Sequence, residues 1–189
     1  MSSNLRQLVA CVRMLLVLTV LLGVLYPAAV WAVGRVAFTD QAGGSLVHRD
    51  GVVVGSSLLG QNFTDARFFQ GRPSASEYAG GVSGGSNLAA SDSAQVKAVK
   101  ERASTYAATD SVTAPADALT ASASGLDPQI SPANARAQAA RVAVANGLTT
   151  ADVLRLVETH TQSRSLGFLG EPRVNVLELN LAVQAAAGR

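Results

Sequence analysis

The feature that most constrains this sequence is an uncharged run over residues 14–34, bracketed by Arg13 and Arg35. At 1.5 Å rise per residue, a helix of that length spans about 30 Å, which is the thickness of the hydrocarbon core of a bilayer. Arg6 and Arg13 precede the run, and the first acidic residue, Asp40, follows it. A single membrane anchor is therefore expected near the N-terminus.

The position of the arginines predicts which way the anchor is oriented. Basic residues beside a span tend to remain in the cytoplasm. We expect a cytoplasmic segment over residues 1–13, a transmembrane helix over 14–34 and an extracytoplasmic domain over 35–189. A cleaved signal peptide is the alternative, but the run is long for a signal core and Val30-Trp31-Ala32 is a poor cleavage site.

The charge balance of the outer domain excludes one class of partner. The chain has 15 basic and 13 acidic residues. Because Arg6 and Arg13 lie before the span, residues 35–189 hold 13 residues of each sign. A neutral domain lacks the basic surface that nucleic acid requires, so no nucleic-acid partner is expected.

Cysteine and histidine usage limits the covalent and metal chemistry. Cys11 is the only cysteine, so no disulfide can form within the chain. The only histidines are His48 and His160, and neither has carboxylates at metal-binding spacing. We expect no metal site and no tightly bound cofactor.

Hydrophobic patterning predicts an α+β fold with one mixed domain after the anchor. Val52-Val53-Val54 and Leu58-Leu59 suggest one or two short strands around a Gly-Ser turn. Residues 94–107 have the periodicity of a helix. Residues 104–124 are rich in Ala, Ser and Thr, and are expected to form a linker or surface excursion.

Capping residues predict the remaining helices. Ser131, Pro132 and Gly147 suit the start and the end of one helix, and a second should begin at Thr149 or Thr150 and end near Arg164. The C-terminal run alternates like a strand. However, Asn175 and Glu178 have the spacing of an N-cap and its third residue, which favours a helix.

A glycine-rich segment is the first candidate site. In Ser83-Gly84-Gly85-Ser86-Asn87, backbone amides could converge on an anion or phosphate, or the segment could be a tight turn. It lacks the lysine of a phosphate-binding loop. Gly81, Ser83 and Gly85 also match the nucleophile elbow of serine hydrolases, with His160 as base and Asp127 or Asp152 as its partner.

Polar residues in turns form a second group of candidates. Asp127 precedes Pro128 and can fix the turn that leads into the helix at Pro132. His160, Arg164, Glu171 and Arg173 surround a Gly/Pro turn, where charges are either paired locally or form a docking rim. Candidate partner contacts are Arg72, Asp127, Glu171, Arg173 and Asn175.

Several blocks, taken in order, carry a resemblance to a known family. The blocks are Gly55-Ser56-Ser57-Leu58-Leu59-Gly60-Gln61, Phe68-Phe69 with Arg72-Pro73-Ser74-Ala75, Ser83-Gly84-Gly85-Ser86-Asn87-Leu88, Thr120-Ala121-Ser122, Gly125-Leu126-Asp127-Pro128, Ile130-Ser131-Pro132, Arg141-Val142-Ala143 and Leu169-Gly170-Glu171-Pro172-Arg173-Val174-Asn175-Val176-Leu177. The chain resembles the C subunit of the Kdp-type potassium-transporting ATPase of bacteria. It departs from the family pattern at Ala89-Ala90, Ala123 and Gln129.

The resemblance implies a non-catalytic accessory subunit in the bacterial inner membrane. Its partners would be a channel-like potassium-binding subunit, a P-type ATPase subunit and a small membrane subunit. The family is described as a catalytic chaperone that raises ATP affinity, which would give Ser83-Gly84-Gly85-Ser86-Asn87 a role with ATP. The predicted topology conflicts with this role, because an outer domain cannot meet cytoplasmic ATP. The predicted topology instead favours a domain that caps the potassium entrance of the channel-like subunit. An anchored extracytoplasmic hydrolase that uses Ser83 is the alternative function.

Overall fold

The computed structural model describes residues 2–188, which form two compact units that divide between residues 46 and 47. The first unit is a continuous helix, Ser3–Ala37, followed by one short turn of helix. Its parts are α1 (Ser3–Val20), the π-helical segment η1 (Leu21–Leu25), α2 (Tyr26–Ala37) and α3 (Thr39–Ala42).

The π-helical turn lets the long helix pass through a proline. Pro27 has no backbone N–H, and in a regular helix its ring would collide with the carbonyl of Gly23. The wider turn relieves this crowding, and the Tyr26 N–H donates to Leu21 O, five residues back. Among residues 2–188 this is the one helix long and apolar enough to cross a membrane, with a mean hydropathy of 2.7 over its most apolar window.

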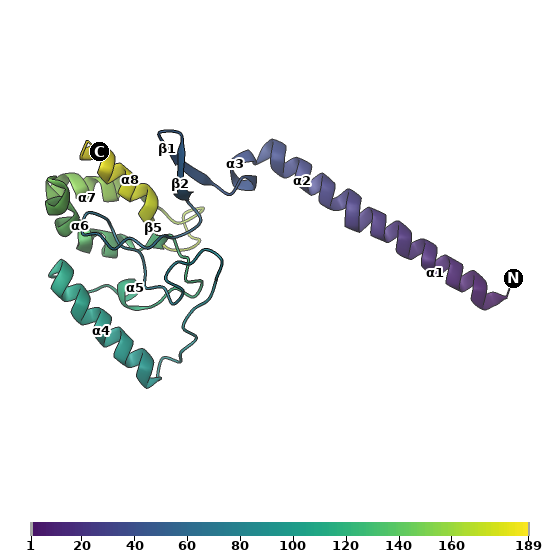
Figure 1. The fold of residues 1–189 in the computed structure, drawn as a ribbon, viewed down its shortest axis with the longest axis horizontal. Coiled ribbons are helices and arrows are strands. Elements are labelled where there is room, and N and C mark those ends of the chain that lie inside the picture. The colour runs from purple at the N-terminus through teal and green to yellow at the C-terminus, as the bar shows by residue number, and fades with distance from the viewer. Residues whose placement is uncertain (1, 189) are drawn as a thin grey trace. The chain divides into compact units, whose positions relative to one another are not determined.

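The second unit is a folded domain, in which Figure 1 shows α6, α7 and α8 gathered together. The elements are β1 (Leu46–Arg49), β2 (Val52–Ser56), α4 (Ser93–Asp110), α5 (Ala116–Leu119), β3 (Gln129–Ile130), α6 (Pro132–Asn146), α7 (Thr150–Thr159), β4 (Thr161–Gln162), β5 (Arg173–Asn175) and α8 (Val176–Ala186). The α+β class predicted from the sequence is confirmed.

A small antiparallel sheet and three helices enclose the core. The strand order is β3-β5-β4, and Val174 of the central strand pairs with Ile130 on one side and Thr161 on the other. The core consists of buried apolar side chains from this sheet, from α6, α7 and α8, and from one loop residue, Phe69. Its members are Phe69, Ile130, Ala135, Ala139, Val142, Ala143, Val153, Val157, Val174, Val176, Leu179 and Val183.

Helix ends follow the capping residues. The Ser131 side chain accepts a bond from the Asn134 N–H at the start of α6, and Gly147 ends that helix with φ of 70°. The Asn175 side chain accepts from the Glu178 N–H, which settles the ambiguous C-terminal run as helix α8. A residue with φ near +70° lacks steric strain only when it is glycine, so Gly147 suits its position.

The structure corrects two of the predicted elements. Leu58 and Leu59 lie in a turn, and the partner of β2 is β1, which precedes it across Asp50-Gly51. Both turn residues have positive φ, as the type I′ turn of a two-residue hairpin requires. Helix α7 ends at Thr159 rather than near Arg164, because Thr161 joins the sheet.

Residues 104–124, which composition marks as a linker or surface excursion, are not a structureless linker. Residues 104–110 continue α4, and α5 follows within the same stretch. Asp110 and Ser122 are buried, and the other residues of the stretch are exposed or partly exposed. The alternative of a surface excursion therefore remains open.

Candidate functional site

The candidate site is built on a long irregular loop, residues 57–92, which contains neither helix nor strand. Backbone polar groups in such a loop need partners wherever they are buried. The side-chain amide of Asn180 is the partner of both backbone groups of Phe69. It accepts from the Phe69 N–H at 2.7 Å and donates to the Phe69 carbonyl at 3.0 Å. Gln138 does the same for Gln70, at 2.8 and 3.1 Å. These amides fix the loop against α6 and α8.

A buried ion pair fastens the same loop to α4. Arg141 Nε lies 2.7 Å from Asp110 Oδ1, and the two side chains are only 9% and 2% exposed. Arg141 Nη1 also donates to the carbonyls of Ala66 and Phe68, at 2.8 and 3.0 Å. One guanidinium group therefore joins α6, the end of α4 and the 57–92 loop.

Two of the predicted contact residues, Arg72 and Asp127, meet in the structure. Arg72 Nη1 lies 3.2 Å from Asp127 Oδ2, and both side chains are half-buried. Arg72 Nη2 donates to the carbonyl of Thr120 at 3.3 Å, while its Nε is buried without a hydrogen-bond partner. Asp127 Oδ1 accepts from the Gln129 N–H, as expected for a residue that fixes this turn.

The ring of Tyr78 closes the loop on itself. Its hydroxyl donates to the carbonyl of Arg72 at 2.7 Å. Gly60 and Gly71 both lie against the ring, and a side chain at either position would overlap it. Glycine is required at positions 60 and 71 because the Tyr78 ring packs directly against the backbone there.

We expect Gly60→Ala to destabilise the domain by roughly 1–3 kcal/mol, because an added methyl group overpacks this site. The new carbon would lie 2.6 Å from the backbone carbonyl of Asp127, which cannot rotate away. Urea unfolding of the detergent-purified chain measures the change. Gly81→Ala is the matched control, since a carbon added there meets nothing within 4 Å. Equal unfolding midpoints would contradict the packing argument.

Alkaline pH should weaken the fold through Tyr78. Burial, reinforced by the nearby Asp127 carboxylate, raises the pKa of Tyr78 to about 12, against an ordinary value of about 10. The stability that neutral Tyr78 contributes to the fold is complete below about pH 10. It is lost as pH rises toward about 12, because Tyr78 ionises at lower pH in the unfolded chain than in the folded one. Stability measured across this window should fall less steeply in Tyr78→Phe, and equal slopes would contradict the assignment.

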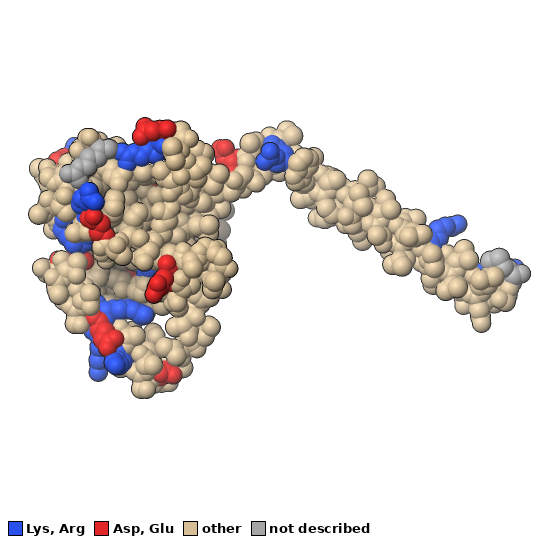
Figure 2. Space-filling model, viewed as in Figure 1, with Lys and Arg blue, Asp and Glu red and all other residues tan. Residues whose placement is uncertain are grey.

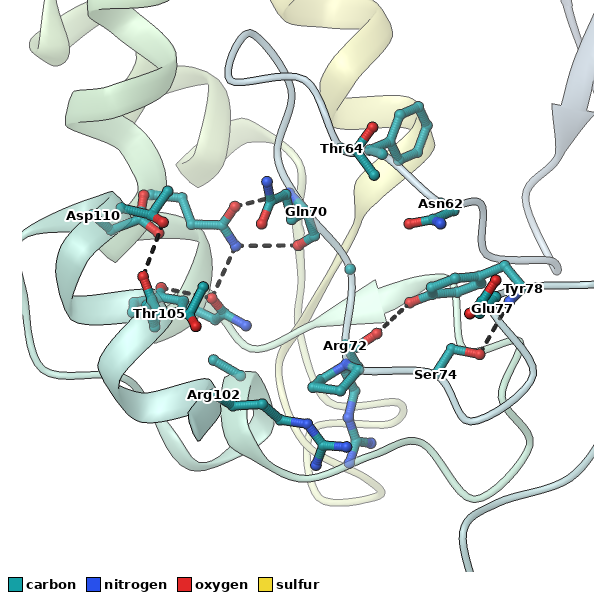
Figure 3. A pocket seen from close by; sticks show the side chains of 18 of the residues that line it. Asn62, Thr64, Gln70, Arg72, Ser74, Glu77, Tyr78, Arg102, Thr105 and Asp110 are labelled. Carbon is teal, nitrogen blue, oxygen red and sulfur yellow. Dashed lines mark hydrogen bonds between the residues drawn. The ribbon is translucent and has the colours of Figure 1, made fainter. Parts of the chain in front are cut away.

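The loop and α4 enclose a pocket of about 810 Å³. Figure 2 shows a hollow on the visible face with acidic and basic side chains near its edge. Figure 3 shows Arg72 and Arg102 approaching each other within it, and the two donate to the neighbouring carbonyls of Thr120 and Leu119. Tyr106 lines the same pocket and donates to Asn134 at 2.9 Å; burial and the carboxylates of Asp110 and Asp117 raise its pKa. This is a polar cleft.

The predicted glycine-rich segment packs against a second turn. The Gly84 N–H donates to the carbonyl of Ser124 at 2.8 Å. A side chain at Gly85 would come within 3.1 Å of the Ala123 carbonyl. Ser83, Ser86 and Asn87 remain exposed. The Gly84 N–H is therefore already hydrogen-bonded within the domain and cannot also bind an anion. This favours a tight turn over an anion-binding loop.

Ser83 does not lie in the strand–turn–helix arrangement that a serine hydrolase requires. A nucleophile elbow needs a strand before the serine and a helix directly after it. Ser83 lies within the irregular 57–92 loop, and the next helix begins at Ser93. His160 Nδ1 lies 2.8 Å from the carbonyl of Leu156, so that nitrogen is engaged within its own helix.

The remaining predicted contact residues, Glu171, Arg173 and Asn175, lie in or beside β5. Glu171 pairs with Arg164 at 2.7 Å. Asn175 is buried, caps α8 and donates to the carbonyl of Ser57 at 2.8 Å. Arg173 lies in β5 opposite Gln162. Within residues 2–188 no group of three or more His, Cys, Asp or Glu side chains could hold a metal ion.

The residues that organise the site are not among those predicted from the sequence. Asn134, Gln138 and Asn146 are all buried polar residues of α6, and Arg141 lies among them. Spacings of four and three place Asn134, Gln138 and Arg141 along one side of the helix, whereas Asn146, five residues further on, lies on the apolar face. Polar residues beside a predicted apolar face were an available signal that they serve as partners for a buried backbone.

Comparisons with known proteins cover both units of the chain. The family described as "K+-transporting ATPase, c chain" matches residues 8–185. Three similar proteins are each named potassium-transporting ATPase KdpC subunit. The protein of Sorangium cellulosum is 54% identical over 92% of this chain and 94% of its own length, that of Kineococcus radiotolerans is 52% identical over 99% and 97%, and that of Mycobacterium bovis is 49% identical over 94% and 97%.

Proposed function

The chain belongs to the KdpC family of potassium-transporting ATPase subunits, and on this premise we propose that it is a non-catalytic accessory subunit of an ATP-driven potassium import complex. The observation that carries the proposal is that the family match includes both the long apolar helix and the outer domain. The helix anchors the subunit in a bacterial inner membrane. Its partners are the channel-like, P-type ATPase and small membrane subunits of the same complex.

Co-purification tests this proposal. Tagged chain is isolated in detergent from membranes of potassium-starved cells, and the eluate is assayed for potassium-stimulated ATP hydrolysis. We expect the other subunits and the activity to elute together. A chain that elutes alone and without activity would contradict the assignment.

We further propose that the N-terminus is cytoplasmic and that the outer domain caps the potassium entrance of the channel-like subunit. Arg6 and Arg13 before the span support this orientation. A neutral domain at the entrance also adds no net charge to repel cations.

The single cysteine allows a direct test of this orientation. A membrane-impermeant maleimide added to spheroplasts should label Cys11 only after the membrane is permeabilised. The matched control is Cys11→Ser combined with Ser163→Cys, which places the thiol at an exposed position of the domain and should be labelled without permeabilisation. The reverse pattern would place the domain in the cytoplasm.

A second candidate role is contact with ATP through Ser83-Gly84-Gly85-Ser86-Asn87, which would require that reversed orientation. The exposure of Ser83, Ser86 and Asn87 supports it, whereas the bond between Gly84 and Ser124 opposes it. Photolabelling of the intact complex with an azido-ATP analogue separates the two roles. ATP-competed label on this subunit that is lost in Ser83→Ala/Ser86→Ala supports nucleotide contact. Label confined to the ATPase subunit opposes it.

A further inference from the structure

An arginine pair, Arg72 of the 57–92 loop and Arg102 of α4, lines the polar pocket. Arg72 Nη2 lies 3.3 Å from the carbonyl oxygen of Thr120, and Arg102 Nη1 lies 2.9 Å from the carbonyl oxygen of Leu119. Because these carbonyls belong to successive residues, the two guanidinium groups lie close together, as Figure 3 shows. The pair therefore concentrates positive charge at one place in the pocket.

Only one carboxylate accompanies the two cations. Asp127 Oδ2 lies 3.2 Å from Arg72, and the ion pairs found among residues 2–188 do not include Arg102. Arg72 is itself loosely held, since its bonds to Asp127 and Thr120 are 3.2–3.4 Å long, whereas charge-assisted bonds are usually about 2.7–2.9 Å. Two partly buried cations with one counterion repel each other. A further negative group beside the pair would relieve this repulsion.

The other acidic side chains that line the pocket do not neutralise the arginine pair. Asp110 is already the counterion of Arg141, and Glu101 pairs with an exposed lysine of its own helix. Glu77 is exposed, and Figure 3 shows it away from the two guanidinium groups. The part of the pocket beside the pair therefore favours an anion.

The loop side of the pocket is held in a strained conformation. Glu77 and Tyr78 have φ of 52° and 61°, in the left-handed region that residues other than glycine rarely adopt. Strain of this kind is concentrated at functional sites. The Tyr78 hydroxyl donates to the carbonyl of Arg72 at 2.7 Å, so the strained turn fixes the backbone that carries one member of the arginine pair.

The size and lining of the pocket indicate a ligand larger than a single ion. Its volume of about 810 Å³ lies within the range of small-molecule sites, roughly 300–1,000 Å³. Arg102, Thr105 and Thr109 all line it from α4, at spacings that place them on one face of the helix. Each threonine hydroxyl donates to a carbonyl of α4, which leaves its oxygen free to accept from a hydroxyl group of a ligand.

We propose that this pocket binds a small hydroxylated molecule through its phosphate or carboxylate group, which the arginine pair holds. Guanidinium groups bind both kinds of oxyanion through paired hydrogen bonds, and the threonine face of α4 receives the hydroxylated part. The pocket lies wholly within the folded domain, so binding requires no other subunit and does not rest on the proposed function.

Equilibrium dialysis of the full-length chain in detergent, at constant ionic strength, tests the proposal with radiolabelled glycerol 3-phosphate and radiolabelled glycerate. We expect one molecule bound per chain. Arg102→Gln removes one guanidinium group and should weaken binding at least about tenfold, as for the loss of a charge-assisted contact. Lys100→Gln is the matched control, because it removes the same charge from an exposed position of α4 outside the pocket, and it should bind like the wild type.

A second variant tests the hydroxylated part of the ligand without changing any charge. Thr105→Val replaces a hydroxyl by a methyl group at an exposed position, and should weaken binding of glycerol 3-phosphate but not of inorganic phosphate. The tighter-binding probe of the two identifies the oxyanion as phosphate or carboxylate. The inference is overturned if neither probe binds the wild type with a dissociation constant below about 10 mM, or if Arg102→Gln and Lys100→Gln bind equally well. Neither result affects the subunit assignment, which co-purification tests separately.

Discussion

Asp110→Ala is expected to destabilise the folded domain by about 3–5 kcal/mol, because it leaves the buried charge of Arg141 without a counterion. Arg141 cannot lose its proton at accessible pH. Its side chain is only 9% exposed, so water cannot replace the carboxylate 2.7 Å away. Urea unfolding of the detergent-purified full-length chain, followed by tyrosine circular dichroism, measures the loss.

Two further variants make this prediction specific. Glu101→Ala, on the same helix, breaks a pair with Lys97 whose side chains are both well exposed, and should cost less than about 0.5 kcal/mol. Asp110→Ala/Arg141→Met removes the unpaired charge, but it also removes the donors to the carbonyls of Ala66 and Phe68, so it should recover only part of the lost stability. A double variant as unstable as Asp110→Ala would show that the unpaired charge does not dominate the loss.

Asn180→Leu is expected to cost roughly 2–4 kcal/mol, since it leaves two buried backbone groups of Phe69 without partners. The side chains of Asn180 and Phe69 are almost fully buried. Leucine has the same number of side-chain heavy atoms as asparagine but is bulkier, so overpacking at this buried site adds to the loss of the hydrogen bonds. The same urea titration reports the effect.

The control for Asn180→Leu is Asn62→Leu, at an exposed position of the same loop, which should leave stability within about 0.5 kcal/mol. Protease digestion gives a second measurement. Residues 57–92 should become sensitive in Asn180→Leu before the helices unfold, because the loop loses its attachment to α8. A loop equally resistant in both proteins would contradict the role assigned to Asn180.

These two predictions concern how a long loop becomes part of a rigid domain. Loops longer than about 12–15 residues without secondary structure are uncommon in compact domains, and are often functional. Here Arg141, Gln138 and Asn180 satisfy backbone groups that a sheet or helix would otherwise satisfy. The loop can therefore hold Arg72 and Tyr78 at fixed positions beside the pocket.

Much of the secondary structure could be predicted because its signals are local. Ser131, Pro132 and Gly147 marked both ends of α6, and Asn175 with Glu178 distinguished helix from strand for α8. Strands β3, β4 and β5 were missed, since two or three residues are too few to show a period. Pairing across the sheet also explains why α7 stops at Thr159.

The candidate site could be predicted only in part. Arg72 and Asp127 were each selected, but their sequence separation gives no sign that they form an ion pair. Asp110 and Arg141 were not selected, because an aspartate at the end of a polar helix looks like a solvated residue. Burial turned it into the counterion of a residue on another helix.

The sequence by itself determined the long apolar helix, the limits of α6, the start of α8 and the family. These depend on runs, caps and ordered blocks, in which each residue acts on its near neighbours along the chain. Only the tertiary structure decided which polar groups become buried partners of the 57–92 loop, and that Arg72 and Arg102 meet in one pocket. Burial and long-range contact depend on how distant segments pack, and the energy of a charge or an amide changes most when packing removes its water.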